Sequence, residues 1–176
     1  GYGSSGSRGT ELEYLEVIKG DKPSEDLFQG VNTTWTRVKG GAPIGKILAQ
    51  VEKDFDFDAP AKSLPALVKA YKLIKGLPNG HWKRVKKAEI EQVIESCLGM
   101  YAEASANAYS ATPGEELQLN LEIINRSTAK VTLNKIEFQP LKEDTTLSLV
   151  LNDNERFNLK RKVDLPEDIS YTNPYW

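Results

Sequence analysis

The sequence has 176 residues, of which 39% are hydrophobic and 27% are charged, and its net charge is −2. This length suits one domain of ordinary size or two small ones, and the composition excludes a chain that is disordered throughout. The near-neutral charge excludes a general attraction to nucleic acid or to anionic membranes, the single cysteine excludes an internal disulfide, and no apolar run reaches the roughly 20 residues that span a bilayer.

Residues 1–42 predict an extended linking segment. They open with GYGSSGSRG, whose glycines match the spacing of a dinucleotide-binding loop. Such a loop needs a buried strand before it and a helix after it, so that a helix N-terminus meets the phosphate, and this stretch lacks that context. We therefore favour a flexible or partner-dependent segment. Beyond it, we expect Leu12, Tyr14 and the stretch Leu15–Ile18 to pack on the helices that follow.

The most unusual part of this segment is NTTWTRVKGG, residues 32–41. Trp35 and Arg37 are two residues apart in a stretch with an extended pattern, so their side chains would project to the same side as an aromatic platform beside a cation. That pair is a candidate site for a sugar or a protein partner. The favoured alternative is that Trp35 anchors the segment in the core against the helices.

Residues 43–107 predict a unit of three amphipathic helices. In the first helix the apolar residues recur along one face: Ile44, Ile47, Leu48, Val51 and Phe55. Pro43 suits a first helical turn, Ser63 is a candidate N-cap for the second helix, and the apolar face of the third helix extends to Tyr101. Helices joined by short loops bury their apolar faces together, and the expected core includes Ile47, Leu48, Leu67, Val93, Ile94 and Leu98.

We expect the charged and potentially metal-binding residues of this unit to have structural roles. DFDFD (54–58) lacks the glycine and glutamate of a calcium loop, so we expect its aspartates to end a helix and its phenylalanines to pack. His81 is the only histidine, and Cys97 has no second thiol, so neither builds a zinc site. KRVKK (83–87) could attract phosphate, but the glutamates that follow it predict a solvated face with paired charges.

Residues 108–176 predict antiparallel strands with one buried face. Apolar residues alternate with polar ones through Leu117–Ile123, and again through Val131–Phe138 after a one-residue slip. Residues 147–151 and 157–165 have the pattern of two more strands. Strands at this spacing, joined by turns, are typical of an immunoglobulin-like antiparallel β-sandwich, although this segment is short for a complete one. The expected fold class is therefore α+β.

Three stretches together resemble one family. GYGSSGSRGTELEYLEVIKGD, DLFQGVNTTWTRVKGG and ATPGEELQLNLEIINRS, followed by PYW, are similar to the C-terminal, non-catalytic part of long bacterial PIG-L/LmbE-like deacetylases. The resemblance implies an N-terminal catalytic domain that removes an acetyl group from an N-acetylglucosamine-type substrate with zinc. It also implies that GYGSSGSRG is the seam where that domain ends, with Arg8 near it, and a periplasmic or cell-surface location.

The family's zinc site carries a His-Pro-Asp-Asp-type motif and further histidines, none of which can be placed on this sequence. The resemblance therefore implies a chain without catalytic or metal residues or a cofactor of its own, zinc belonging to the absent catalytic domain, which is the expected partner. The candidate binding residues are Trp35, Arg37 and Arg8. The alternative is a stand-alone carbohydrate- or protein-binding module. Nucleic acid and a membrane span are not expected.

Overall fold

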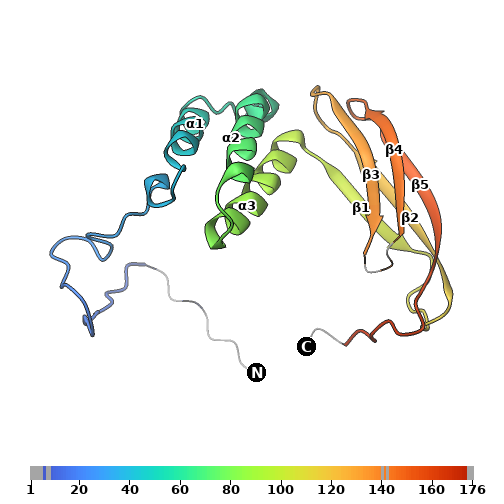
Figure 1. Cartoon of the computed structure of the whole chain (residues 1–176), viewed down its shortest axis with the longest axis horizontal. Helices are drawn as coiled ribbons and strands as arrows, with labels where there is room; N and C mark the ends of the chain where they lie inside the picture. The colour runs from blue at the N-terminus through green and yellow to red at the C-terminus, as the bar shows by residue number, and fades with distance from the viewer. Residues whose placement is uncertain (1–5, 7–8, 140, 142, 174–176) are drawn as a thin grey trace. The chain divides into compact units, whose positions relative to one another are not determined.

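The computed structural model describes residues 6, 9–139, 141 and 143–173. The fold is α+β, as expected: in the described part, three α-helices precede five strands that pair antiparallel (Figure 1). The chain divides into two compact units, the first ending at Thr33 and the second beginning at Thr34. We call residues 9–33 the arm and residues 34–173 the body. All helices and strands of the described residues belong to the body.

The helical part of the body matches the predicted periodicity closely. Its elements are the 3-10 turn η1 (Trp35–Arg37), α1 (Ala42–Lys53), the 3-10 turn η2 (Pro60–Ser63), α2 (Leu64–Gly76) and α3 (His81–Leu98). A Cβ atom at Gly41 would collide with the carbonyl oxygen of Trp35, so glycine permits the tight turn from η1 into α1. Ser63 does stand at the N-cap position of α2, but its side chain makes no capping hydrogen bond.

The helices bury two neighbouring apolar clusters. The first holds Ile44, Ala70, Ile74, Leu77 and Ile90, and the second holds Leu64, Leu67 and Cys97. Leu48 and Ile94 pack against both clusters and so connect them. The predicted core is confirmed fully for Leu67, and Ile47, Leu48, Ile94 and Leu98 are half-buried against these clusters.

Val93 was expected in this core and is 46% exposed, so that prediction is wrong. The physical reason is the limited width of the helix face that α1 and α2 cover. Ile90, Ile94 and Cys97 lie along the covered stripe of α3, and Val93 lies beside it at the edge.

The strands form two sheets. β1 (Tyr101–Ala106), β2 (Glu116–Ile124) and β5 (Arg156–Asp164) make one sheet in the order β1-β2-β5, and β3 (Val131–Phe138) pairs with β4 (Glu143–Leu151) in the other. The register between β3 and β4 shifts between Leu133 and Lys135, which confirms the one-residue slip in the hydrophobic pattern. Leu121, Phe138 and Val163 come together in one buried cluster, so the two sheets share a core.

The end of the helical part was predicted wrongly. α3 stops at Leu98 because Gly99 takes a left-handed conformation, φ +58°, and its N–H bonds back to the carbonyl of Ser96. Tyr101, expected on the third helix, instead begins β1 and lies opposite Ile124 of β2. The strands therefore start within the 43–107 segment, at residue 101.

Candidate functional site

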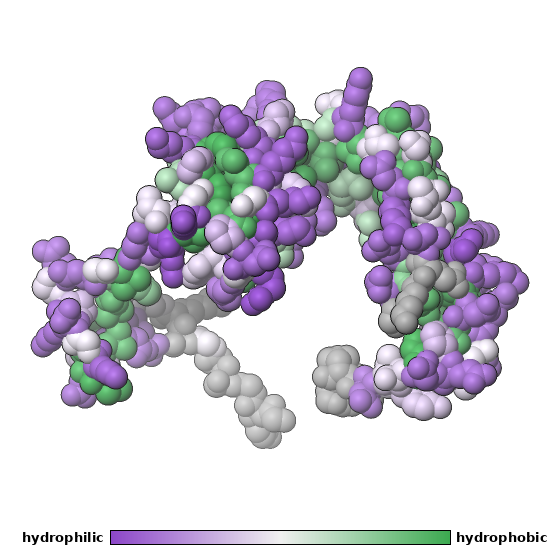
Figure 2. Space-filling view, in the orientation of Figure 1, coloured by the Kyte–Doolittle hydropathy of each residue, from purple (hydrophilic) through white to green (hydrophobic). Residues whose placement is uncertain are grey.

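The arm exposes more large apolar side chains than any other part of the described chain. Every described arm residue except Pro23 is exposed, including Tyr14 at 90% and Ile18 at 97%. The expectation that Leu12, Tyr14 and Leu15–Ile18 pack on the helices concerns a contact between the two units, and it stays a prediction. Figure 2 shows hydrophobic side chains uncovered along the arm, and the set is Leu12, Tyr14, Leu15, Val17, Ile18, Leu27, Phe28 and Val31.

The arm is also strongly acidic. Residues 9–33 contain six carboxylate side chains and two lysines, a net charge of −4 in a chain whose total is −2. Exposed large apolar side chains that gather in one part of a chain mark surfaces that bind another molecule. The arm therefore combines apolar contact area with negative charge.

The second half of the arm contains one hydrogen-bonded turn. The backbone N–H of Ser24 and its hydroxyl both donate to Oε1 of Gln29, at 2.7 and 3.0 Å. The N–H of Phe28 donates to Oδ1 of Asp26 at 2.9 Å, and the N–H of Gln29 to the carbonyl of Asp26. These bonds close residues 24–29 into a turn that presents Leu27 and Phe28 to solvent.

The structure separates the candidate pair Trp35 and Arg37. They lie in the 3-10 turn η1, so the expectation of an extended segment with both side chains on one side is wrong. Trp35 is half-buried against the first helical cluster, in agreement with the core-anchor alternative. The Arg37 guanidinium lies 4.1 Å from the ring centre of Trp82, which lies in the first turn of α3. Arg8 lies outside the described residues.

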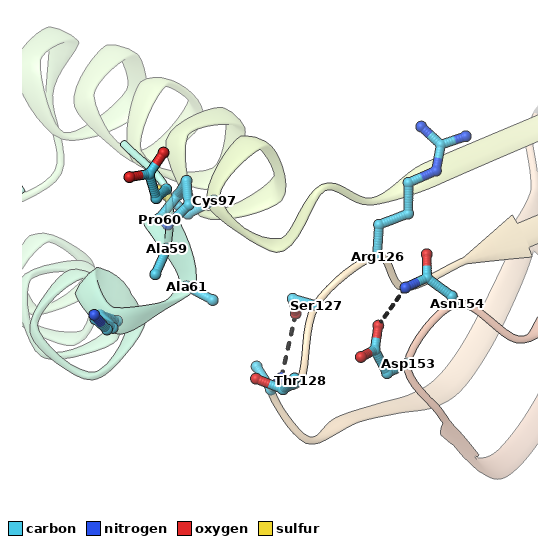
Figure 3. Close-up of a pocket in the computed structure, with 12 residues that line it drawn as sticks. Ala59, Pro60, Ala61, Cys97, Arg126, Ser127, Thr128, Asp153 and Asn154 are labelled. Atoms are coloured by element: carbon cyan, nitrogen blue, oxygen red, sulfur yellow. Dashed lines mark hydrogen bonds between the residues drawn. The ribbon is translucent and has the colours of Figure 1, made fainter. Parts of the chain in front are cut away.

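The helices and strands of the body meet around a cavity of about 470 Å³ (Figure 3). Residues 58–62 and Cys97 line its helical side, and residues 126–129 with Asp153 and Asn154 line the other. Three of its charged side chains interact with other residues of the chain. Lys62 pairs with Asp56 at 2.7 Å, Asp153 accepts a hydrogen bond from Asn154, and Arg126 lies over the ring of Tyr101.

Cys97 at this cavity is a packing residue. It belongs to the second helical cluster and is 8% exposed. Burial raises the pKa of its thiol, so the neutral form is retained at physiological pH and the nucleophilic thiolate is disfavoured. A role as a catalytic nucleophile therefore has no support in its surroundings.

Asn125 organises the strand side of the cavity, and sequence reasoning did not find it. Its side chain is fully buried, and its Nδ2 donates to the carbonyls of Ala129 and Leu151 at 3.0 and 3.2 Å. Its Oδ1 accepts from the N–H and the hydroxyl of Ser127 at 3.1 and 2.8 Å. These four bonds hold Ala129 in position, where it packs against the helical cluster of Leu64, Leu67 and Cys97.

The acidic stretch 54–58 is bonded within the chain. Asp54 caps the end of α1, as expected, and Asp56 accepts from Lys62, whose hydrogen bond is the main cause that lowers the pKa of the Asp56 carboxyl. Phe55 packs in the core, whereas Phe57 is 88% exposed, against the expectation that both phenylalanines pack. Within the described residues, no group of three or more His, Cys, Asp or Glu side chains could hold a metal ion.

The basic cluster 83–87 has the paired charges that its sequence predicts. Lys86 bonds Glu89 at 2.7 Å, and Lys87 bonds Glu91 at 2.9 Å, along the surface of α3. Tyr71 of α2 donates to the same Glu91 carboxylate at 2.9 Å. The hydrogen bond from Lys87 is the main cause that lowers the pKa of Glu91.

Comparisons with protein-family models, with curated proteins and with solved structures found no match. Among the helices of the described residues, none combines the length and the apolar character needed to cross a membrane.

Proposed function

We propose that this chain is the accessory, non-catalytic region of a PIG-L/LmbE-like zinc-dependent deacetylase, and that it supports or positions a catalytic domain which this chain does not contain. The observation that carries the proposal is the arm, in which eight large apolar side chains between Leu12 and Val31 are exposed. Burial of these side chains against another protein surface would stabilise the complex by about 25 cal/mol for each Å² of apolar surface removed from water.

Several further features belong to the same proposal. The family resemblance assigns zinc and the hydrolytic chemistry to the catalytic domain. The two sheets of the body form an immunoglobulin-like sandwich that serves as a rigid support. The family resemblance adds a periplasmic or cell-surface location.

The alternative is a stand-alone carbohydrate- or protein-binding module. The two tryptophans expected as an aromatic platform for a carbohydrate are engaged within the chain, because Arg37 covers one face of Trp82 and Trp35 is packed among the helices. The exposed aliphatic side chains of the arm favour a protein partner instead.

The test begins with the coding sequence ahead of Gly1, where the proposal expects a domain with a His-Pro-Asp-Asp-type motif. The longer protein is then compared with a variant in which Leu12, Tyr14, Leu15 and Ile18 are changed to serine. We expect the variant to lower the unfolding temperature of the catalytic domain and to leave that of the body unchanged. Serine replacements at Val68, Val93, Val150 and Tyr109, which are exposed on the body, are the matched control. Equal unfolding temperatures of the catalytic domain in all three proteins would exclude a supporting role.

A further inference from the structure

We propose that residues 11–18 of the arm bind the partner as an added β-strand, at a sheet edge that carries lysine or arginine side chains. This inference rests on the proposed function, because it specifies how the arm binds and what chemistry its partner offers.

The first reason is the backbone of the arm. Between Leu12 and Pro23 no backbone–backbone hydrogen bond joins the described residues. If the apolar side chains of this stretch are buried against a partner, their N–H and C=O groups come out of water with them. Buried backbone groups need partners, and an open sheet edge supplies a matching row of donors and acceptors, whereas a flat apolar surface does not.

The second reason is the period of the side chains. In a strand, successive side chains point to opposite faces, so Leu12, Tyr14 and Ile18 would share one face with Glu16. These three apolar residues have the highest exposed fractions among the large apolar residues of the arm, and each is at least 77% exposed. The opposite face would carry Glu11 and Glu13 together with Leu15 and Val17. Each face of the strand would therefore offer apolar contact area and at least one carboxylate to the partner.

The third reason is charge. The net charge of −4 on residues 9–33 opposes binding to nucleic acid or to an anionic lipid surface and favours a partner with positive charge. Exposed sheet edges commonly carry lysine, which blocks pairing with most strands. An acidic strand can still pair with such an edge, because its carboxylates form ion pairs with the lysine ammonium groups that disfavour other strands.

Two measurements on the longer protein separate this inference from the proposed function. Hydroxyl-radical footprinting reports whether the Leu12, Tyr14 and Ile18 side chains are covered, which tests docking. Amide hydrogen exchange, resolved by residue, reports whether the backbone is paired. An edge strand pairs on one side only, so we expect alternate amides from Glu11 to Ile18 to exchange about tenfold more slowly, or slower still, than in the 176-residue chain alone.

Two variants test the two parts of the inference. Leu15→Pro inserts a residue that strands exclude, in a stretch without helix or strand of its own, so we expect lost amide protection with the body still folded. The charge reversal Glu11→Lys, Glu13→Lys, Glu16→Lys should reduce the protection about tenfold, and salt should reduce it in the unaltered protein. The matched control reverses three exposed charges on the body: Glu52→Lys, Glu167→Lys and Asp168→Lys.

The outcomes are distinct. Covered side chains without alternate amide protection would overturn strand addition and leave the proposed function standing. Protection that survives the arm charge reversal would overturn the basic partner edge. Side chains and amides that stay as open as in the isolated chain would overturn both proposals.

Discussion

The arm and the first helix contain similar large apolar residues, but these side chains are exposed in the arm and buried or half-buried in the helix. Ile18 in the arm is 97% exposed, whereas Ile44 in α1 is fully buried, and both belong to stretches rich in large aliphatic side chains. The difference lies in what each stretch can complete alone. The helix satisfies its own backbone and then needs only a neighbouring face, which α2 and α3 supply. In the arm, no backbone–backbone hydrogen bond joins described residues between Leu12 and Pro23, so this stretch forms no helix or strand that could present a face to a neighbour.

The largest expected effect comes from a matched pair of isoleucine truncations. Ile74→Ala, in the helical core, should lower the free energy of unfolding of the chain by about 2–5 kcal/mol, because it leaves a cavity among packed side chains. Ile18→Ala should change it by less than about 0.5 kcal/mol, since nothing packs on that side chain in the isolated chain. Denaturant unfolding of both variants decides the matter. A loss above 1 kcal/mol for Ile18→Ala, roughly twice the surface limit, would mean that the arm belongs to the folded core.

The next effect extends the comparison to polar groups. Asn125→Ala should cost about 1–3 kcal/mol, because it leaves buried groups of Ser127, Ala129 and Leu151 without their hydrogen bonds. Gln29→Ala removes an exposed amide that accepts two hydrogen bonds in the arm, and should be nearly neutral. Thermal unfolding monitored by circular dichroism measures both. Similar losses in the two variants would contradict the assignment of the arm as an unsupported segment.

A smaller effect locates the boundary between arm and body. Arg37→Ala should cost about 0.5–1 kcal/mol, the usual contribution of an exposed cation over an aromatic ring, because Arg37 ties η1 to Trp82 of α3. Arg84→Ala, an exposed residue of the same helix, is the control. Urea unfolding monitored by tryptophan fluorescence gives the values. If Arg37→Ala behaved like its control, the contact between Arg37 and Trp82 would contribute nothing measurable to stability.

The smallest effect concerns pH. Lys87 and then Tyr71 hydrogen-bond Glu91 and lower the pKa of its carboxyl from the ordinary value of 4.5. A lowered pKa stabilises the fold above the unfolded-state value, and that contribution disappears as the pH falls through the folded-state value. Glu91 is more than a third exposed, so the contribution is below about 0.5 kcal/mol.

The check for Glu91 is a pair of unfolding curves. Glu91→Gln should be slightly less stable than the unaltered chain at pH 7 and equal to it once the pH lies below the lowered pKa that Glu91 has in the folded chain. Glu52→Gln, at an exposed position of α1, serves as the control. A difference that persists at the acidic pH would assign the effect to the amide substitution itself.

The sequence predicts a helix or strand well where the hydrophobic pattern within that one segment is complete. The helices, β2, β3 and β5 carry clear periods, and the slip before Ile136 marks a real shift in register. The predicted strand 147–151 covers only the second half of β4, which begins at Glu143, because the EDTT stretch carries no apolar residue. β1 was missed because YAEASA places alanines where a strand usually shows large apolar residues. The exposure of Val93 depends on which neighbours cover α3, and a helical period alone does not contain that information.

The candidate site was less predictable than the fold. Trp35 and Arg37 appear in the sequence as a pair, but η1 turns Arg37 toward Trp82, which lies 45 residues later. Asn125 gives a weak signal, because its partners are mostly backbone groups and one of them, Leu151, is 26 residues away. The apolar residues of the arm were visible in the sequence. Their exposure depends on which other residues cover them, and a hydrophobic pattern does not contain that information.

The four hydrogen bonds of Asn125 have a consequence for production of the chain in a glycosylating host. Asn125-Arg126-Ser127 fits the acceptor pattern for N-linked glycans. In the folded chain the acceptor nitrogen already donates to two carbonyls in a site closed to solvent. A glycan can therefore be attached only before β2 and β4 come together, and once attached it blocks their closure. The modified fraction would consist of misfolded chains, and its size would report how slowly this end of the sheets forms.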